Sequence, residues 1–319
     1  MAAALNAALR DALREDDRVV IYGEDVGRLG GVFRVTDGLQ QEFGDTRCFD
    51  SPVAESGIVG TAVGMAMYGM HPVVEMQFDG FSYPALDQVI SHVAKYRNRT
   101  RGKLGLPMVI RIPYGGGIGA VEHHSESPEA YYAHTAGLTV VSPGTPSDAY
   151  SLLRQSISHP DPVVFLEPKR RYWVKEDVEL PVQGEPIGRA VVRRPGTTAT
   201  LIAYGPMVTT AMEAAGAAQS DGWDLEVVDV RTLTPLDVDT LVASVSKTGH
   251  AVVIHEAQRF AGYGAEIAAQ LSERAFGHLA APVLRVAGFD VPYPPAKIER
   301  YFLPDADRIL DAVAHSLEY

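Results

Sequence analysis

Glu55 is a carboxylate placed just before a run of small and apolar residues, GIVGTAVGMAMYG at 57–69. An ionised carboxylate buried without a partner is unfavourable, so such a group shifts its pKa, finds a donor or meets a ligand. Gly60 and Gly64 lie four residues apart, a spacing that lets another helix or a ligand approach the backbone closely. The position of Glu55 therefore indicates an acid that meets a ligand or, as the simpler alternative, an acid that complements the dipole of a helix beginning there.

Aromatic side chains gather in the segment EMQFDGFSYPALDQ, which follows shortly afterwards. Phe78, Phe81 and Tyr83 stand near Gln77 where an expected strand ends, and open α/β sheets bind ligands outside the carboxyl ends of their strands. A flat heteroaromatic ligand would suit this place. Ordinary core aromatics are the alternative explanation for Phe78 and Tyr83.

Two adjacent histidines, His123 and His124, lie in the loop GGGIGAVEHHSESPEAYY. Ser127 and Pro128 predict the N-cap and the first position of a following helix. Near a helix N-terminus the dipole disfavours imidazolium, so a neutral imidazole is expected. Such a group could exchange protons near pH 7.

Other chemistries fit this loop less well. A metal site would need a third ligand at a recognisable spacing, which the histidine pair lacks. Ser125 stands in no GxSxG nucleophile elbow, which argues against a serine hydrolase. The GGGIG run has no P-loop lysine, so a flexible turn that lets a ligand approach is preferred over a phosphate cradle.

Short β-rich runs alternate with helical patterns, which is typical of α/β layers around a mainly parallel sheet. The expected strands of the first series are 18–25, 72–78, 107–113, 138–141 and 162–168. The expected helices of this series include 57–69, 83–99 and 145–157. The last of them has Thr145 as N-cap and Pro146 at the first helical position.

A stretch rich in Pro, Gly and charge separates this series from a second one. The sequence therefore predicts two α/β domains, at 1–180 and 196–319, joined by a linker at 181–195. In the second domain, residues 225–233 (LEVVDVRTL) are expected to form one strand.

The composition is that of a globular protein: of 319 residues, 46% are hydrophobic and 21% charged. No apolar run is long enough to span a bilayer, and the N-terminal MAAALNAALRDALRED predicts an amphipathic helix instead of a secretory signal. The net charge of −12 argues against nucleic-acid binding. Cys48 is the single cysteine, so no internal disulfide forms and a cytoplasmic location is expected.

Taken in order along the chain, these segments resemble the beta subunits of the thiamine-diphosphate-dependent 2-oxo acid dehydrogenases. In the first half the resemblance rests on DSPVAESGIVGTAVGMAMYG, EMQFDGFSYPALDQV, KYRNRTRG, EHHSESPEAYYAHTAGLTVVSPGTPSDA and DPVVFLEPKRRY. In the second half it rests on EVVDVRTLTPLDVDTLVASVSKTG, VVIHEAQRFAGYGAEIA and APVLRVAGFDVPYPPAKIE. It implies an N-terminal pyrimidine-binding domain with a parallel sheet and a C-terminal transketolase-like α/β domain. The implied activity is oxidative decarboxylation of 2-oxo acids with acyl transfer to a lipoyl group.

The resemblance also implies roles for four residues. Glu55 matches the glutamate that hydrogen-bonds the aminopyrimidine of thiamine diphosphate and favours the imino form, whose nitrogen takes the proton from the thiazolium carbon. Phe81 matches the aromatic that packs on the pyrimidine, and Gln77 lines the same pocket. His124 matches the histidine at the mouth of the active site that assists acyl transfer to the lipoyl group. His123 has no such counterpart.

The chain lacks the Gly-Asp-Gly that begins the motif by which the alpha subunits of this family hold magnesium and the diphosphate. The resemblance therefore implies a cofactor shared with an alpha subunit, in an alpha-2-beta-2 heterotetramer with active sites at subunit interfaces. The beta chain alone is expected to be inactive. The second domain is expected to serve assembly, and the acidic charge of the chain suits docking to the basic binding domain of the acyltransferase core.

A potassium ion held by backbone carbonyls is a further implication of the resemblance. Its residues here are Leu106, Met108, Val109, Ser156, His159 and Asp161. Carbonyl ligands leave no side-chain pattern, so the residues themselves carry no signal for this ion.

The segments HHSESPEAYYAHTAGL and FLEPKRRYW are more similar to branched-chain enzymes than to pyruvate enzymes. The expected substrates are 3-methyl-2-oxobutanoate and its homologues, with pyruvate as the alternative. Two other functions fit the sequence less well. A self-sufficient transketolase-type enzyme would need its own Gly-Asp-Gly motif, and a purely structural subunit would have no use for Glu55, Phe81 and His124 together.

Overall fold

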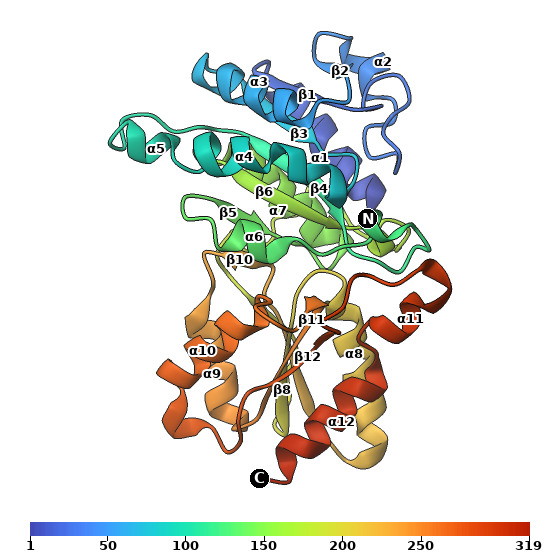
Figure 1. The fold of residues 1–319 in the computed structure, drawn as a ribbon, viewed down its shortest axis with the longest axis vertical. Coiled ribbons are helices and arrows are strands. Elements are labelled where there is room, and N and C mark those ends of the chain that lie inside the picture. The colour runs from blue at the N-terminus through green and yellow to red at the C-terminus, as the bar shows by residue number, and fades with distance from the viewer.

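Two β-sheets, one above the other in Figure 1, organise the chain, and the computed structural model describes all of residues 1–319. The first sheet has the strand order β10-β5-β6-β4-β3-β1-β2 and the second the order β12-β11-β8-β9-β7. The strands are β1 (Val19–Gly23), β2 (Cys48–Asp50), β3 (His71–Glu75), β4 (Val109–Tyr114), β5 (Thr139–Val141), β6 (Val163–Pro168), β7 (Val191–Arg194), β8 (Ala199–Ala203), β9 (Leu225–Asp229), β10 (Thr232–Thr234), β11 (Ala251–Gln258) and β12 (Leu284–Gly288).

Helices fill the connections between the strands. They are α1 (Ala2–Glu15), α2 (Leu39–Phe43), α3 (Glu55–Met67), α4 (Leu86–Gln88), α5 (Tyr96–Arg99), α6 (Glu129–Ala133), α7 (Pro146–Ser158), α8 (Met207–Ala217), α9 (Val238–Thr248), α10 (Gly264–Arg274), α11 (Glu299–Phe302) and α12 (Ala306–Leu317). The two-domain α/β architecture expected from the sequence is confirmed.

The first sheet is parallel except at its β10 edge. Every residue of β1, β4 and β6 is buried, as expected for parallel strands that are covered on both faces. On one face α1 packs against α7, with Leu5, Leu9 and Leu13 at four-residue spacing directed into the core. The other face is covered by α3 and the helical segment that follows Phe81.

Helix α7 begins as the sequence predicts. The Thr145 side chain accepts a hydrogen bond from the backbone N–H of Asp148, and Pro146 occupies the first turn. By contrast, the single helix expected at 83–99 is divided into a 3₁₀ helix (Asp79–Ala85), α4, a π-helical turn (Val89–Val93) and α5. Pro84 lacks an N–H group, so the first part lacks one regular helical hydrogen bond.

The run expected to form one strand at 225–233 forms two strands in different sheets. β9 pairs in parallel with β8, whereas β10 pairs antiparallel with β5 of the first sheet. Arg231, between them, has a positive φ of 55° and is fully buried. Its Nε donates to Asp148 Oδ1 at 2.8 Å, so this buried ion pair fixes the crossing between the sheets. The periodicity of the sequence carries no sign of such a turn.

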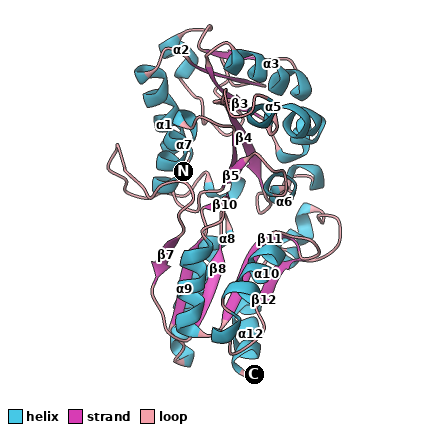
Figure 2. Cartoon of the chain, turned by 90° about the vertical axis from the view of Figure 1, so that its left-hand side faces the viewer, coloured by secondary structure: helices cyan, strands magenta, loops and turns pink.

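The second sheet has helices on both faces, α9 and α10 on one and α8 and α12 on the other (Figure 2). Its edge strand β7 lies within the stretch expected to be a linker and pairs antiparallel with β9. A single hydrophobic core continues from the first sheet through Tyr204 and Leu233 to α9 and α10. None of the helices has the length and apolar character needed to cross a bilayer.

Candidate active site

The first sheet brings most of the predicted site residues to the carboxyl ends of its strands. Gly23 of β1 and Glu75 of β3 are in register, so the residues after these two strands leave the sheet side by side. Glu24 follows β1 and Gln77 lies just beyond β3. Glu55 enters from α3, which begins shortly after β2.

Glu55 is the first residue of α3 and only 7% exposed. Its carboxyl group lies beside that of Glu24, which is 5% exposed. Burial, together with the neighbouring Glu55 carboxyl, raises the pKa of Glu24 to about 7. Near neutral pH the Glu24 carboxyl is therefore protonated part of the time, and its buried Oε1 has no hydrogen-bond partner.

Glu24 is a site residue that the sequence reasoning missed. A signal for it does exist, because an acid that directly follows a buried parallel strand lies at the edge where such sheets bind ligands. Gln77 joins the same group: its Nε2 donates to Asp25 Oδ2 at 2.8 Å. A continuous polar row thus runs from Gln77 through Asp25 and Glu24 to Glu55.

Phe81 and His124 lie in contact, with ring centroids 5.0 Å apart at 77°. Phe78 stacks on His124 at 4.2 Å and 16°. Tyr83 lies apart from this cluster and donates instead to Glu126 Oε2 at 2.5 Å. The 3₁₀ helix that carries Phe81 packs on α3, where the Ser56 hydroxyl donates to the Pro84 carbonyl. The structure therefore places the aromatic cluster next to the helix that begins with Glu55.

Gly80 permits the close approach between this 3₁₀ helix and the histidine loop. A Cβ atom at residue 80 would collide with the carbonyl oxygen of His123. Only glycine lets the two backbones come this near.

Burial lowers the pKa of His124, and the charges of His123 and Lys169 lower it further. This is the direction expected from the sequence, but its main cause is desolvation instead of a helix dipole. The His123 side chain, by contrast, is not buried: it is 58% exposed and lies beside Glu122.

The expected cap of the following helix is wrong. Helix α6 begins at Glu129 with Pro128 at the N-cap position, and the buried Ser127 Oγ has no hydrogen-bond partner. The fully buried Glu129 carboxyl accepts a hydrogen bond from the Tyr204 hydroxyl at 2.7 Å. An acid in the first turn complements the dipole at the helix start.

The glycine loop before the histidines is held by carboxylates of the second domain. Glu256 accepts from the backbone N–H of Gly116, and Glu299 accepts from those of Gly117 and Gly119 at 3.1 and 2.9 Å. These N–H groups are therefore already paired within the chain. The expectation that the second domain serves only assembly needs extending, because it also fixes this loop.

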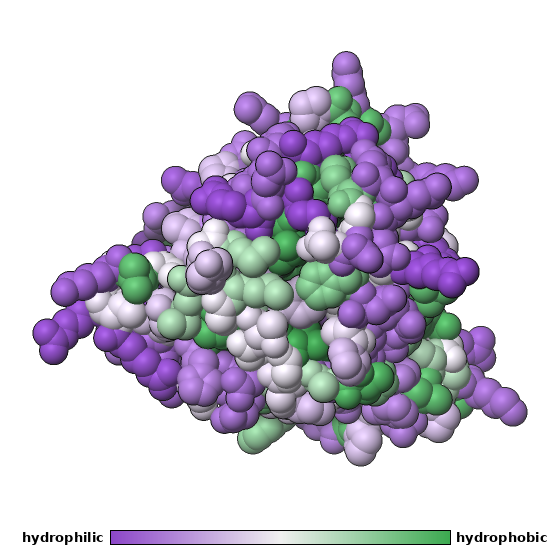
Figure 3. All heavy atoms as spheres, turned by 90° about the horizontal axis from the view of Figure 1, so that it is seen from above, coloured by the Kyte–Doolittle hydropathy of each residue, from purple (hydrophilic) through white to green (hydrophobic).

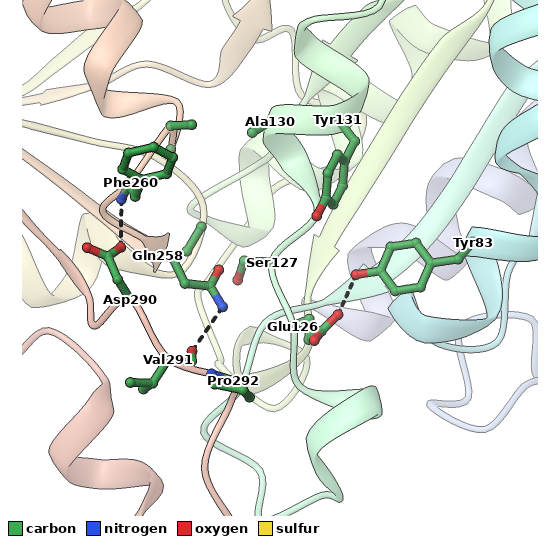
Figure 4. Close-up of a pocket in the computed structure, with 13 residues that line it drawn as sticks. Tyr83, Glu126, Ser127, Ala130, Tyr131, Gln258, Phe260, Asp290, Val291 and Pro292 are labelled. Atoms are coloured by element: carbon green, nitrogen blue, oxygen red, sulfur yellow. Dashed lines mark hydrogen bonds between the residues drawn. The ribbon is translucent and has the colours of Figure 1, made fainter.

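A pocket of about 480 Å³ lies between the two domains beside this loop (Figure 4). From the first domain, Tyr83, Glu126 and Tyr131 face Gln258 and Asp290 of the second. The Tyr83–Glu126 hydrogen bond forms one wall. Glu126, two positions after His124, thus lines this pocket.

The residues expected to hold potassium lie near the amino ends of β4 and β6, whereas the site described above lies at the carboxyl ends of the strands. The start of β4 pairs with the start of β6, where Val163 N–H donates to the Met108 carbonyl at 3.0 Å. His159 Nδ1 lies 2.9 Å from the Asp161 carbonyl, and the Ser156 carbonyl accepts from His159 N–H at 3.2 Å. The two segments are therefore neighbours in space, with two of these carbonyls, those of Met108 and Ser156, already accepting a backbone hydrogen bond.

Comparison with known proteins places both halves of the chain. Residues 1–174 match the transketolase pyrimidine-binding domain and residues 188–309 the transketolase C-terminal domain. A solved structure described as a split-gene transketolase, inactive beta4 tetramer, superposes with a TM-score of 0.83 at 25% identity, covering 99% of this chain and 97% of that one. These matches define a chain of two transketolase-type domains, the first from a family that uses thiamine diphosphate.

Curated relatives are similar over nearly the full length. The 3-methyl-2-oxobutanoate dehydrogenase subunit beta of Mycobacterium tuberculosis is 57% identical over 99% of this chain and 91% of its own. The pyruvate dehydrogenase E1 component subunit beta of Leifsonia xyli is 55% identical over 100% and 95%. The 2-oxoisovalerate dehydrogenase subunit beta of Pseudomonas aeruginosa is 46% identical over 95% and 90%. The chain belongs to the family of 2-oxo acid dehydrogenase beta subunits.

Proposed function

We propose that this chain is the beta subunit of a branched-chain 2-oxo acid dehydrogenase and that Glu55, with Glu24, binds the pyrimidine end of thiamine diphosphate. The observation that carries the proposal is the placement of two buried carboxyls, Glu24 and Glu55, beside each other at the carboxyl ends of the strands, where burial raises the pKa of Glu24 to about 7. A carboxyl group donates a hydrogen bond when it is protonated and accepts one when it is ionised. Such a pair can exchange a proton with a ring nitrogen.

The other residues of the site fit the cofactor as well. Phe81 offers an aromatic face next to α3, and Gln77 lies on the polar row that ends at Glu55. The unpartnered Oε1 of Glu24 is a buried polar atom suited to a ligand. When bound, thiamine diphosphate supplies the electron sink that lets a 2-oxo acid lose carbon dioxide.

His124 is proposed to act at the later acyl transfer to a lipoyl group. Its lowered pKa keeps the ring neutral near pH 7, so it can take up or release a proton there. Stacking on Phe78 and contact with Phe81 place it on the aromatic side of the site.

An alpha subunit is proposed to hold the diphosphate and magnesium, because this chain has no Gly-Asp-Gly motif. The outer face of α3 supports such a partner. Figure 3 looks onto this end of the molecule and shows small and apolar side chains gathered within a hydrophilic surround. Tyr68, the C-cap residue of α3, is 90% exposed, and Gly57 and Gly64 leave the helix backbone open on the surface. The assembly proposed is an alpha-2-beta-2 heterotetramer, docked to the acyltransferase core.

Several further features belong to the proposal. We propose that the two domains span 1–180 and 196–319 and that a linker joins them at 181–195. We also propose that potassium binds to backbone carbonyls of the segments around Leu106 and His159. A cytoplasmic location is proposed because the single cysteine, Cys48, is buried and unpaired.

The substrate proposal can be tested directly. The chain would be co-expressed with its alpha partner, and kcat/KM would be compared for 3-methyl-2-oxobutanoate and pyruvate. We expect the branched substrate to be preferred by at least about tenfold, as differences of one or two methylenes allow. A preference for pyruvate would identify the enzyme as a pyruvate dehydrogenase. The purified chain alone, with thiamine diphosphate and magnesium, is expected to show no decarboxylation.

A further inference from the structure

A buried ion pair between Lys169 and Asp79 lies beneath the aromatic cluster. Both side chains are fully buried. Lys169, which directly follows β6, donates through Nζ to Asp79 Oδ1 and to the main-chain carbonyl of His124, the latter at 2.6 Å. The second oxygen of Asp79 accepts from the backbone N–H of Glu126 at 2.8 Å. The pair therefore binds the main chain on both sides of Ser125.

Stability alone does not explain this pair. Burial lowers the pKa of Lys169 and raises that of Asp79 to about 6, so desolvation disfavours each charge. Replacing a buried ion pair by neutral side chains of similar volume is often without effect on stability or even stabilising. What the pair uniquely supplies here is a fixed hydrogen bond to the histidine loop.

The pair also connects the elements that surround the His124 ring. Asp79 is the first residue of the 3₁₀ helix that carries Phe81. Lys169 Nζ lies 5.6 Å from the centre of the Phe78 ring, on whose face His124 stacks. The loop, the helix and the end of β6 thus meet at a single ammonium group.

We propose that Lys169 is a positioning residue for acyl transfer: through the His124 carbonyl, and with Asp79 as its counter-charge, it fixes where the His124 imidazole stands. The inference rests on the role proposed above for His124. Lys169 itself touches neither substrate nor cofactor in this scheme.

Two variants separate positioning from simple stabilisation. Lys169→Met removes the donor and leaves the Asp79 charge buried and unpaired, which is expected to destabilise the fold. The double variant Asp79→Asn/Lys169→Met removes both charges, while the new amide oxygen can still accept from Glu126 N–H. The double variant therefore contains no unpaired buried charge, but the His124 carbonyl still lacks the hydrogen-bond donor that Lys169 supplied.

The experiment uses the heterotetramer with its alpha subunit and measures two partial reactions. One is decarboxylation with an artificial dye as electron acceptor, and the other is acyl transfer to an isolated lipoyl domain. We expect the double variant to assemble and to decarboxylate within about threefold of the wild type. Its acyl transfer is expected to fall at least tenfold, since small misplacements of a reacting group have effects of this size. Recovery of normal transfer in the double variant would overturn the proposal.

Controls identify which idea fails. His124→Ala sets the loss caused by removing the imidazole: if it leaves transfer unchanged, the role proposed for His124 is wrong and the present inference falls with it. If His124→Ala impairs transfer and the double variant does not, only the positioning role is wrong. Lys247→Met is the matched control, because Lys247 pairs with the buried Glu226 in the second domain, away from the loop. Its transfer rate is expected to stay within twofold.

Hydrogen exchange supplies a readout that does not depend on activity. In the double variant, peptides covering 115–128 are expected to exchange at least about tenfold faster, with little change in β1 and β4. Unchanged protection of the loop would contradict the proposal even if activity fell.

Discussion

At the scale of single residues, the site depends on an acid whose protonation is set by burial. Glu24 lies beside Glu55, and the pKa of Glu24 is raised to about 7, mainly by burial. As pH rises through about 7, Glu24 loses its proton and can no longer donate one in the site. Decarboxylation by the wild type is therefore expected to decline above this pH.

The variant Glu24→Gln removes this titration while keeping the size of the side chain. We expect the alkaline decline near pH 7 to disappear from the kcat/KM profile of decarboxylation, and the activity at its maximum to fall. Glu273→Gln, at an exposed position of α10, is the control and should retain the wild-type profile. An unchanged inflection near pH 7 in Glu24→Gln would show that another group titrates.

At the scale of elements, the site depends on two backbones that touch at Gly80. Gly80→Ala would place a Cβ against the carbonyl of His123 and push the histidine loop away from the 3₁₀ helix. Decarboxylation and acyl transfer are both expected to fall at least about tenfold, since Phe81 and His124 both move. Circular dichroism would check that the variant stays folded.

Gly216→Ala is the control for Gly80→Ala, because it makes the same change at a glycine outside the site. Gly216 lies in α8 with no atom near the added methyl group, so alanine should raise the free energy of unfolding by about 0.5–1 kcal/mol and leave activity unchanged. Wild-type activity in Gly80→Ala would contradict the close packing described here.

At this same scale the sequence predicts much of the structure, because alternating apolar runs and caps such as Thr145 act locally. The features that the sequence does not predict depend on contacts between segments that are far apart in the chain. The break between β9 and β10 depends on the buried Arg231–Asp148 pair, and the Glu24–Glu55 contact joins segments that are distant in the chain. Long-range contacts of this kind leave no local pattern.

At the scale of the whole molecule, the second domain carries a buried titratable group. His255 of β11 is fully buried, neither ring nitrogen has a hydrogen-bond partner, and burial lowers its pKa to about 4 from 6.5. A lowered folded-state pKa contributes stability above pH 6.5, and that contribution is lost as pH falls toward 4. The loss amounts to about 3 kcal/mol at most, because one pKa unit is worth about 1.4 kcal/mol.

Stability between pH 7 and 4 tests this point. The thermal midpoint of the assembled heterotetramer is expected to fall with acid, and His255→Leu is expected to flatten the fall. The surface variant His315→Leu should leave the slope as in the wild type, since that ring is 60% exposed. Equal slopes for His255→Leu and the wild type would assign the acid sensitivity to other groups.

The role of Glu55 is tested most directly by the rate at which the reconstituted heterotetramer exchanges the C2 proton of bound thiamine diphosphate for deuterium. Substituting Glu55→Gln keeps the shape of the side chain and removes its ability to exchange a proton with the pyrimidine. We expect the exchange rate to fall at least about 100-fold, the usual range for loss of a general acid–base group, with the cofactor still bound. Exchange within threefold of the wild type would contradict the account.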